Sequence, residues 1–351
     1  MNRGAAVTLT LLLAAAPAGA QAPVFATITA VAESEAVEAD PDDPAIWVNA
    51  DDPAQSRIIG TDKQVGLVVF DLAGTAVQRL SDGRLNNIDL RQHVSLGGEE
   101  LTLAAATRRD DDTIVFYTID AEGTLAPAEP FAFPGAPREI GDDIYGLGLY
   151  HDARSGRLYV VVNFKTGDVF QWEVTSTDDR LALELRREWS VPSQPEGIVA
   201  DDALGSIYVG EEDGGIWRFP ADPEAEPIGT MIDAVGSACL PVDDVEGMAV
   251  GPSGGPEDGY LVVSAQGVNR YVLYPRRPDA EGRQPCLGGV EVGTGPTDPV
   301  SETDGLDVAT GVVTQEFPRG VMVVQDDRNE GFSRNFKFVS WADVLEALGL
   351  D

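Results

Sequence analysis

The 351-residue sequence has little histidine, little cysteine and little positive charge, and each shortage excludes a class of function. It contains two His and two Cys, so a zinc or iron centre built from several imidazole or thiolate ligands is nearly excluded. Its 24 Lys and Arg stand against 59 Asp and Glu, for a formal net charge of -35. Such a chain repels nucleic acid and anionic membrane surfaces unless it carries metal ions, and we expect neither as a partner.

Long hydrophobic runs are also missing. The apolar run from Ala5 to Ala16 is too short for a transmembrane helix, and no later stretch approaches the roughly 18 residues that one needs. This run follows Arg3 and precedes a small-residue site that ends at Ala20, a pattern typical of a secretory signal. We therefore predict that residues 1–20 are a signal peptide cleaved near Ala20, and that the protein is secreted or periplasmic.

The two cysteines have two possible states in such an oxidising compartment. Cys239 and Cys286 either pair and close a loop of 47 residues, or remain separate free thiols.

Amphipathic helix patterns are almost absent as well, except at residues 341–348. The 38 Gly and 23 Pro instead separate short β-rich runs, such as residues 66–70 and 158–162. Short strands at regular spacing, separated by turn signals, indicate a sandwich, a barrel or a propeller.

A repeat of about 50 residues distinguishes among these architectures. Degenerate copies begin near Asp43 and Asp89, 46 residues apart, and four clearer copies carry glycines spaced by 51, 50 and 58 residues: Gly146, Gly197, Gly247 and Gly305. Six units of this length correspond to four-stranded propeller blades. We therefore predict an all-β fold, a six-bladed β-propeller with four-stranded antiparallel blades, as one domain over residues 21–351 with a short C-terminal helix.

Acidic residues recur beside these openings, at Asp42, Asp89, Asp142, Asp143, Glu196, Asp244, Glu246 and Asp304. If the blades are equivalent, these positions lie at one rim near the central channel. Carboxylates without histidine are hard oxygen ligands that suit Ca²⁺, Mg²⁺ or Mn²⁺. A solvated acidic face that serves solubility is the alternative. Scattered surface acids would not follow the repeat, so the spacing favours a metal site.

The scarce basic residues near the same openings are also informative. Lys63, the pair Arg108-Arg109 and Lys165 could each be an exposed loop cation. Together they suit a multiply anionic ligand held between cations and metal ions.

Six sequence blocks between about Glu33 and Trp341 carry a resemblance to a known family. They are DDPAIW (42–47), GRLNNIDLR (83–91), EGIVADD (196–202), EEDGGIW (211–217), SAQG (264–267) and TDGLDV (303–308). In register and with small gaps, they resemble the β-propeller (alkaline) phytases. The resemblance implies a 3-phytase type of enzyme that hydrolyses phosphate monoesters of inositol hexakisphosphate (phytate) with several bound Ca²⁺ ions.

The resemblance also implies a role for individual residues. The calcium ligands at the cleft would be Glu33, Asp42, Tyr145, Glu196, Glu212, Asp244, Glu246 and Asp304. The substrate phosphates would contact Lys63, Arg109, Lys165 and Gln266, with Asn86 and Tyr145 close by. Among these, the catalytic residues would be Glu196, Glu212, Asp304, Lys63 and Arg109. Separate stabilising calcium ions would use Asp43 with the carbonyls of Pro44 and Ile88, and Asp298 near Asp326 or Asn329.

One residue departs from the family pattern. The family commonly places an acidic residue after the lysine that corresponds to Lys165, whereas this chain has Thr166. This change puts in doubt one calcium ligand, or the strength of the second phosphate subsite.

Charge supports a metal-dependent phosphatase, because a chain at -35 attracts phytate only when divalent ions neutralise its carboxylates. No Ser, Cys or His is placed as a nucleophile, so we expect direct attack by metal-bound water on phytate, the small-molecule substrate of a monomeric enzyme. Two alternatives stay open. One is a calcium-dependent lactonase-type propeller, which needs few cations. The other is a non-enzymatic propeller that displays a binding face.

Overall fold

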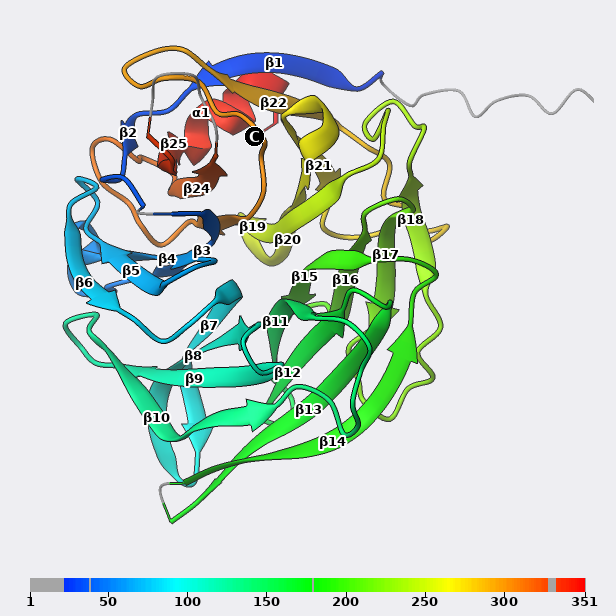
Figure 1. Ribbon diagram of the computed structural model, residues 1–351. Coiled ribbons are helices and arrows are strands. Elements are labelled where there is room, and N and C mark those ends of the chain that lie inside the picture. Colours follow the sequence, from blue (N-terminus) through cyan, green and yellow to red (C-terminus); the bar gives the residue numbers. More distant parts are fainter. Residues whose placement is uncertain (1–21, 38, 179, 328–332, 351) are drawn as a thin grey trace, which may run out of the picture.

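Six sheets surround a central axis in the computed structural model, which describes residues 22–37, 39–178, 180–327 and 333–350 (Figure 1). The arrangement confirms the predicted six-bladed β-propeller. The innermost strands of the six blades begin at or next to the six predicted repeat openings. They are β3 (Pro41–Trp47), β7 (Leu85–Leu96), β11 (Ile144–Asp152), β15 (Pro195–Asp201), β19 (Val245–Ser253) and β23 (Leu306–Ala309).

Further strands extend each blade outward in antiparallel order. The first three blades continue with β4 (Arg57–Asp62), β5 (Gly66–Phe70) and β6 (Ala76–Leu80); β8 (Glu99–Arg108), β9 (Thr113–Ile119) and β10 (Leu125–Pro134); and β12 (Arg157–Phe164), β13 (Asp168–Thr177) and β14 (Arg180–Ser190). The last three continue with β16 (Ser206–Glu211), β17 (Gly215–Pro220) and β18 (Thr230–Ala234); β20 (Gly255–Ala265), β21 (Arg270–Pro275) and β22 (Gly288–Gly293); and β24 (Val321–Asp326), β25 (Asn335–Ser340) and β2 (Ala32–Glu33).

The N-terminal segment closes the ring. Strand β2 pairs antiparallel with β25 and supplies the outer strand of the sixth blade, with Glu33 opposite Lys337. Strand β1 (Val24–Thr29) lies parallel to β22 and adds a fifth strand to the fifth blade (Figure 1). This parallel strand is a feature that the repeat did not predict.

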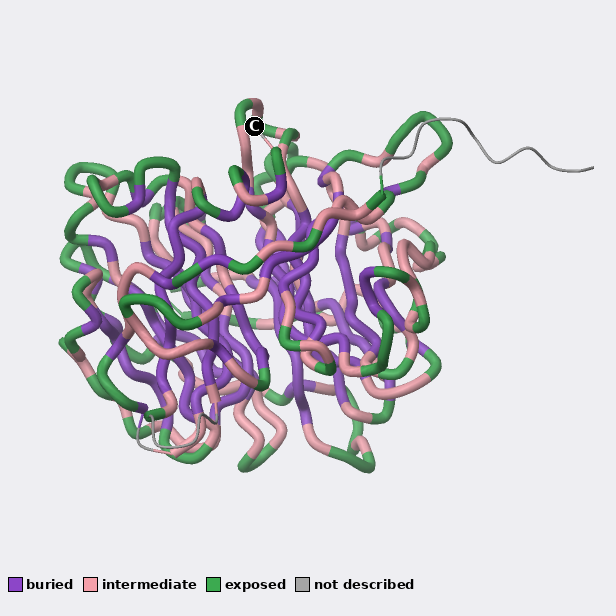
Figure 2. The backbone as a smooth tube through the Cα atoms, turned by 90° about the horizontal axis from the view of Figure 1, so that it is seen from above, coloured by how far each residue is buried: buried purple, intermediate pink, exposed green. Residues whose placement is uncertain are grey.

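Apolar side chains pack in six clusters, one between each pair of neighbouring blades. Successive residues of a strand point to opposite faces. Ile58 therefore packs against the sixth blade and Ile59 against the second. Because both faces of a blade are covered, its middle strands, such as β5, are buried along their whole length, whereas the outermost strands, such as β6, are partly exposed. Buried residues therefore fill the ring between exposed loops (Figure 2).

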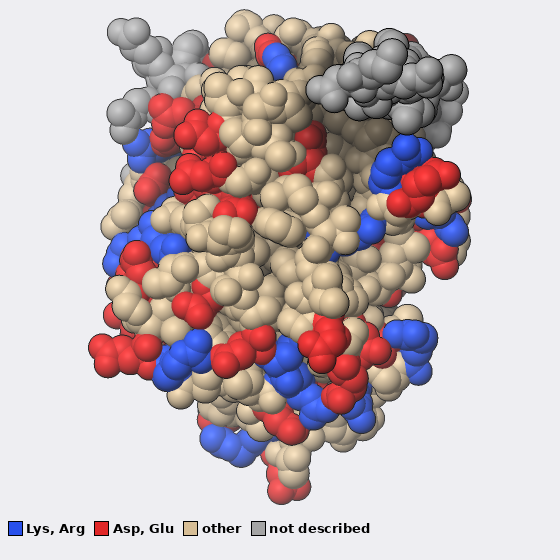
Figure 3. Space-filling model, turned by 90° about the vertical axis from the view of Figure 1, so that its right-hand side faces the viewer, with Lys and Arg blue, Asp and Glu red and all other residues tan. Residues whose placement is uncertain are grey.

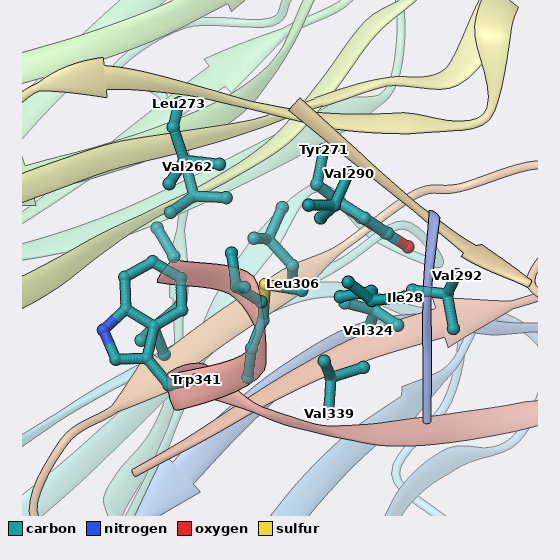
Figure 4. Packing of buried hydrophobic residues seen from close by; sticks show 14 of the residues in the cluster. Ile28, Val262, Tyr271, Leu273, Val290, Val292, Leu306, Val324, Val339 and Trp341 are labelled. Atoms are coloured by element: carbon teal, nitrogen blue, oxygen red, sulfur yellow. The ribbon is translucent and has the colours of Figure 1, made fainter. Parts of the chain in front are cut away.

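The largest of these clusters, between the fifth and sixth blades, also holds the C-terminal helix. Helix α1 (Trp341–Leu348) has the predicted bounds and ends at Gly349, whose left-handed φ of 66° suits glycine. Trp341 and Ile28 of β1 pack into this cluster (Figure 4). Over the described ranges, no helix has both the length and the hydropathy of a membrane span.

The two cysteines form a disulfide. Cys239 precedes β19 and Cys286 precedes β22, and the bond joins these loops across 47 residues. Of the two states that the sequence left open, the structure contains the paired one.

Strand direction places the candidate site. Antiparallel strands alternate in direction, so the start of each inner strand and the turn between the second and third strands lie at the same end of a blade. The repeat openings and the turns that carry Lys63, Lys165, Glu212 and Gln266 therefore gather at one end of the propeller.

Candidate metal and phosphate site

The glycines of the repeat allow neighbouring blades to approach closely at the channel mouth. A Cβ atom at Gly146 would collide with the carbonyl of Glu196, and one at Gly197 with that of Glu246. In the next two blades, a Cβ at Gly247 would meet the carbonyl of Asp304, and one at Gly305 that of Asp42. At each of these contacts, the absence of a side chain on the glycine leaves room for the backbone of the acidic residue in the next blade.

Two acidic groups result, and Glu196 belongs to both. Carboxylate oxygens of Asp42, Glu196 and Asp304 lie within 4.8 Å of one another, and so do those of Glu196, Glu212 and Glu246. All of these residues except Glu212 are buried. The structure therefore brings together five of the predicted calcium ligands, from four blades.

Burial and mutual repulsion make these carboxyl groups hard to ionise together. Burial, and next the charge of Asp304, raise the pKa of Asp42 well above its ordinary value. Burial and then Glu196 raise the pKa of Glu246 in the same direction. Burial is also the main reason that the pKa of Glu212 rises to about 7. The cluster is therefore short of positive charge.

The pKa values of Glu196 and Asp304 are set by burial together with the charged and hydrogen-bonding groups around them. Burial opposes ionisation of Glu196, but a hydrogen bond from Glu246 and the charge of Lys63 outweigh it and lower the pKa of Glu196. Lys63 Nζ lies 2.9 Å from Asp42 Oδ1 and 3.0 Å from Asp304 Oδ2. Burial still raises the pKa of Asp304. One ammonium group therefore does not offset this many buried carboxylates.

Several carboxylate oxygens lack hydrogen-bond partners, which tests whether a cation fits. Within the described ranges, Oδ2 of Asp42 and Oε2 of Glu246 accept no hydrogen bond, and the contact of Asp42 Oδ1 is the Lys63 ammonium at 2.9 Å. Buried polar atoms in native proteins nearly always have partners. Unpartnered carboxylate oxygens are the ligands that a hard cation such as Ca²⁺ takes, so the donor set fits calcium.

Basic and polar side chains gather on the neighbouring blades around Tyr145. The guanidinium of Arg109 lies 5.5 Å and the ammonium of Lys165 4.3 Å from the centroid of the Tyr145 ring. Asn86 Nδ2 donates to Glu196 Oε1 at 2.9 Å, and thereby links the cations to the acids. Burial and then the nearby Glu196 raise the pKa of Tyr145, so its phenol stays neutral. The predicted phosphate contacts thus meet the predicted metal ligands.

The predicted residues on the fifth blade complete the rim. The Gln266 amide donates to the Thr303 carbonyl at 3.0 Å, and its backbone N–H donates to the Asp244 carbonyl at 2.9 Å. Asp244 has a φ of 85°, a left-handed conformation that is strained for a residue other than glycine.

Thr166, the departure from the family pattern, lies in the turn between β12 and β13 of the third blade and donates its hydroxyl to Asp168 at 2.7 Å.

Two predicted ligands belong to a different group. Glu33 accepts hydrogen bonds from Lys337 and Asn335, so its carboxylate is not part of either acidic group at the mouth. The buried Lys337 ammonium also lies 2.5 Å from Asp298 and 3.2 Å from Asp326. Lys337 therefore supplies positive charge where the resemblance implies a stabilising calcium, and Asn329 lies outside the described residues.

Asp43 lies deeper, at a cavity of about 40 Å³ on the propeller axis. Pro44 and Ile88 line the same cavity, and Asp43 Oδ2 accepts a hydrogen bond from Ile88 N at 3.0 Å. Burial raises the pKa of Asp43 well above its ordinary value. The three residues assigned together from the resemblance therefore do lie together.

Gln194 and Asp143 each form a hydrogen bond with a predicted site residue. Gln194 Nε2 donates to Glu212 Oε1 at 2.5 Å, and no sequence pattern pointed to it. Asp143 accepts from Arg109 at 2.5 Å, although its place in the acidic recurrence suggested a metal role. Spacing along the chain finds acids near the mouth but does not identify the partner of each.

Known proteins are similar to this chain over most of its length. The model of the family described as Phytase matches residues 3–351. The chain is 36% identical over 319 residues to a 3-phytase of Bacillus subtilis (strain 168), which covers 88% of this chain and 81% of that protein. Together with the propeller fold and the acidic residues at the channel mouth, these matches show that the chain belongs to the phytase family.

Proposed function

We propose that the protein is a calcium-dependent phosphomonoester hydrolase that acts on phytate. The observation that carries this proposal is the meeting of unpartnered carboxylate oxygens with Lys63, Arg109 and Lys165 at one channel mouth. The acids suit calcium and the cations suit phosphate, and phytate with calcium offers both. A lactonase would have no use for three cations at this position.

The acidic residues would hold the ions. Calcium bound there would neutralise phosphoryl oxygens and lower the pKa of a bound water. The ligands at the mouth would be Asp42, Tyr145, Glu196, Glu212, Asp244, Glu246 and Asp304. Asp43 would serve a separate stabilising ion on the axis, whereas Glu33 and Asp298 already have the Lys337 ammonium as their counter-charge.

The basic and polar residues would bind and orient the phosphate. Lys63 is now tied to Asp42 and Asp304, and calcium on those carboxylates would free its ammonium for a phosphoryl oxygen. Arg109 and the neutral phenol of Tyr145 would donate to the same group. Lys165, Gln266 and Asn86 would hold the neighbouring phosphate. Preorganised donors of this kind stabilise the charge that develops in phosphoryl transfer.

Water is the nucleophile in this proposal. Among the described residues neither acidic group contains a Cys or a His, and a bound Ca²⁺ would supply an activated water beside the phosphorus. Direct attack by water on phosphorus therefore accounts for the reaction without a covalent phosphoenzyme.

The decisive experiment measures phosphate release from calcium-phytate by the purified protein, before and after exhaustive chelation and after calcium is restored. We expect activity that is lost with the chelator and recovered with calcium. Activity that survives chelation contradicts calcium dependence, and a phosphoenzyme trapped by acid quench contradicts direct attack. Failure to release phosphate under any metal condition overturns the function, and lactone hydrolysis would then support the alternative.

The N-terminus and the assembly state belong to the same proposal. We infer that residues 1–20, which lie outside the described residues, direct export and are removed, and that residues 21–351 act as a monomer. The Cys239–Cys286 disulfide is in keeping with an oxidising compartment. Mass spectrometry of the exported protein and its elution volume in size-exclusion chromatography test both points.

A further inference from the structure

Arg84 is a cation at the channel mouth whose partner is missing. It is half-buried, and its guanidinium forms no ion pair or side-chain hydrogen bond with any residue in the ranges that the structure describes. By contrast, Lys63 pairs with Asp42 and Arg109 with Asp143. In a chain with 59 acidic residues, a half-buried arginine without a carboxylate partner is available to bind an external anion.

The backbone places Arg84 beside Arg109. Gly83, with a φ of 101°, turns the chain into β7, and Arg84 N donates to Asp110 Oδ2 at 2.9 Å. Arg109 N then donates to the Arg84 carbonyl at 2.8 Å. Opposite residues of an antiparallel pair share one face of the sheet. Leu85, next to Arg84, packs toward the first blade, so Arg84 and Arg109 lie on the face turned toward the third blade.

Charge on the third blade agrees with this placement. Asp143 precedes β11 and accepts a hydrogen bond from Arg109, and the charges of Lys165 and Arg84 act on the same carboxylate. Three cations thus surround one partly exposed carboxylate. Two of the three, Lys165 and Arg84, form no ion pair within the described part of the chain.

We propose that Arg84 binds a third phosphate group of the substrate, beside those held at Lys63 with Arg109 and at Lys165. The guanidinium suits a phosphate dianion because its planar fork can donate two parallel hydrogen bonds. The site would then prefer inositol polyphosphates with phosphates on three neighbouring ring carbons. This inference rests on the proposed function and adds a specificity-determining residue to it.

The test compares Arg84→Gln, Arg84→Lys and a control, Arg319→Gln, with the unchanged protein in the presence of calcium. Arg319 is exposed and precedes β24 at the opposite end of the sixth blade. We expect Arg84→Gln to raise KM for phytate about tenfold with kcat changed by less than about twofold, the signature of lost ground-state binding. Arg84→Lys should recover part of the loss, and Arg319→Gln should match the unchanged protein.

Inositol monophosphate separates the subsites, because it cannot reach Arg84 while it is being cleaved. Its KM should change far less than that of phytate. Equal losses on both substrates, or an unchanged KM for phytate, would overturn the inference. If the unchanged protein releases no phosphate at all, the proposed function fails, and calorimetric titration with calcium-phytate then decides the role of Arg84. Weaker binding by Arg84→Gln would support the third subsite, and equal affinity would overturn it.

Discussion

Single carboxylates at the channel mouth are coupled through Glu196. It is a member of both acidic groups, and it accepts a hydrogen bond from Asn86 at 2.9 Å. A change at any one acid therefore alters the charge that the others experience. Glu212 and Asp304 are the informative members, because each belongs to a different group and has an amide isostere.

We expect Glu212→Gln and Asp304→Asn each to lower kcat on calcium-phytate by about an order of magnitude or more, since each removes a charge from a shared ion site. Steady-state rates at saturating calcium check this, with Glu122→Gln as a control. Glu122 is exposed in the turn between β9 and β10, at the other end of its blade. Rates equal to those of the unchanged protein in both variants would refute the placement of the cleft.

Lys165 has a separate expected effect, because its ammonium packs on the Tyr145 ring and has no carboxylate partner among the described residues. If Lys165 holds a phosphate next to the one that is cleaved, as the proposed function has it, Lys165→Ala should raise KM for phytate more than it lowers kcat. A simple monoester should be almost unaffected, and Lys165→Arg should retain most of the binding. If both substrates suffer equally, Lys165 belongs to the cleavage subsite instead.

At the level of strands and blades, much of the fold could be predicted because each blade is a local unit. The glycine spacing identified the inner strands, since the same close approach recurs at Gly146, Gly197, Gly247 and Gly305. Strand β1 could not be predicted, because its partner β22 lies more than 250 residues away and only packing selects it. Likewise, Gln194 and Arg84 do not recur with the repeat of about 50 residues. Only the folded structure shows that Gln194 contacts Glu212 and that Arg84 has no ion-pair partner among the described residues.

Ring closure by β1 and β2 predicts how the protein responds to N-terminal truncation. Removing residues 1–34 deletes both strands, takes Ile28 from the cluster around Trp341 and leaves buried Lys337 without Glu33. We expect the thermal unfolding midpoint to fall by about 5 °C or more, since about 1 kcal/mol shifts it by several degrees. Removing residues 1–21 should leave it unchanged. Equal midpoints for the two truncated proteins would show that the N-terminal strands do not close the ring.

Over the whole molecule, negative charge is divided between two environments. On the outer face seen in Figure 3, Lys and Arg side chains lie beside Asp and Glu side chains, where solvent screens them. At the mouth, by contrast, acids are buried with few cations, and water screens them poorly. Between pH 6 and 8, pH-dependent stability comes from groups whose pKa changes on folding, and at the mouth these are the buried acids.

The stability of the folded protein should depend on both pH and calcium. The pKa of Glu212 rises from an ordinary value of 4.5 to about 7 in the folded protein, so the folded state binds a proton more tightly than the unfolded chain. Without calcium, its contribution to stability is fully present below about pH 4.5 and is lost as pH rises through 7. In chelator, the unfolding midpoint should therefore be higher at pH 6 than at pH 8.

Calcium should reverse this trend, because it binds ionised carboxylates and stabilises only the folded state. The rise in midpoint on adding calcium should be larger at pH 8 than at pH 6, as scanning calorimetry in matched buffers can measure. A glutamine at position 212 cannot titrate, so in chelator the Glu212→Gln variant should lose less stability between the two pH values. An unfolding midpoint that is the same with and without calcium at both pH values would show that the buried acids bind no calcium ion.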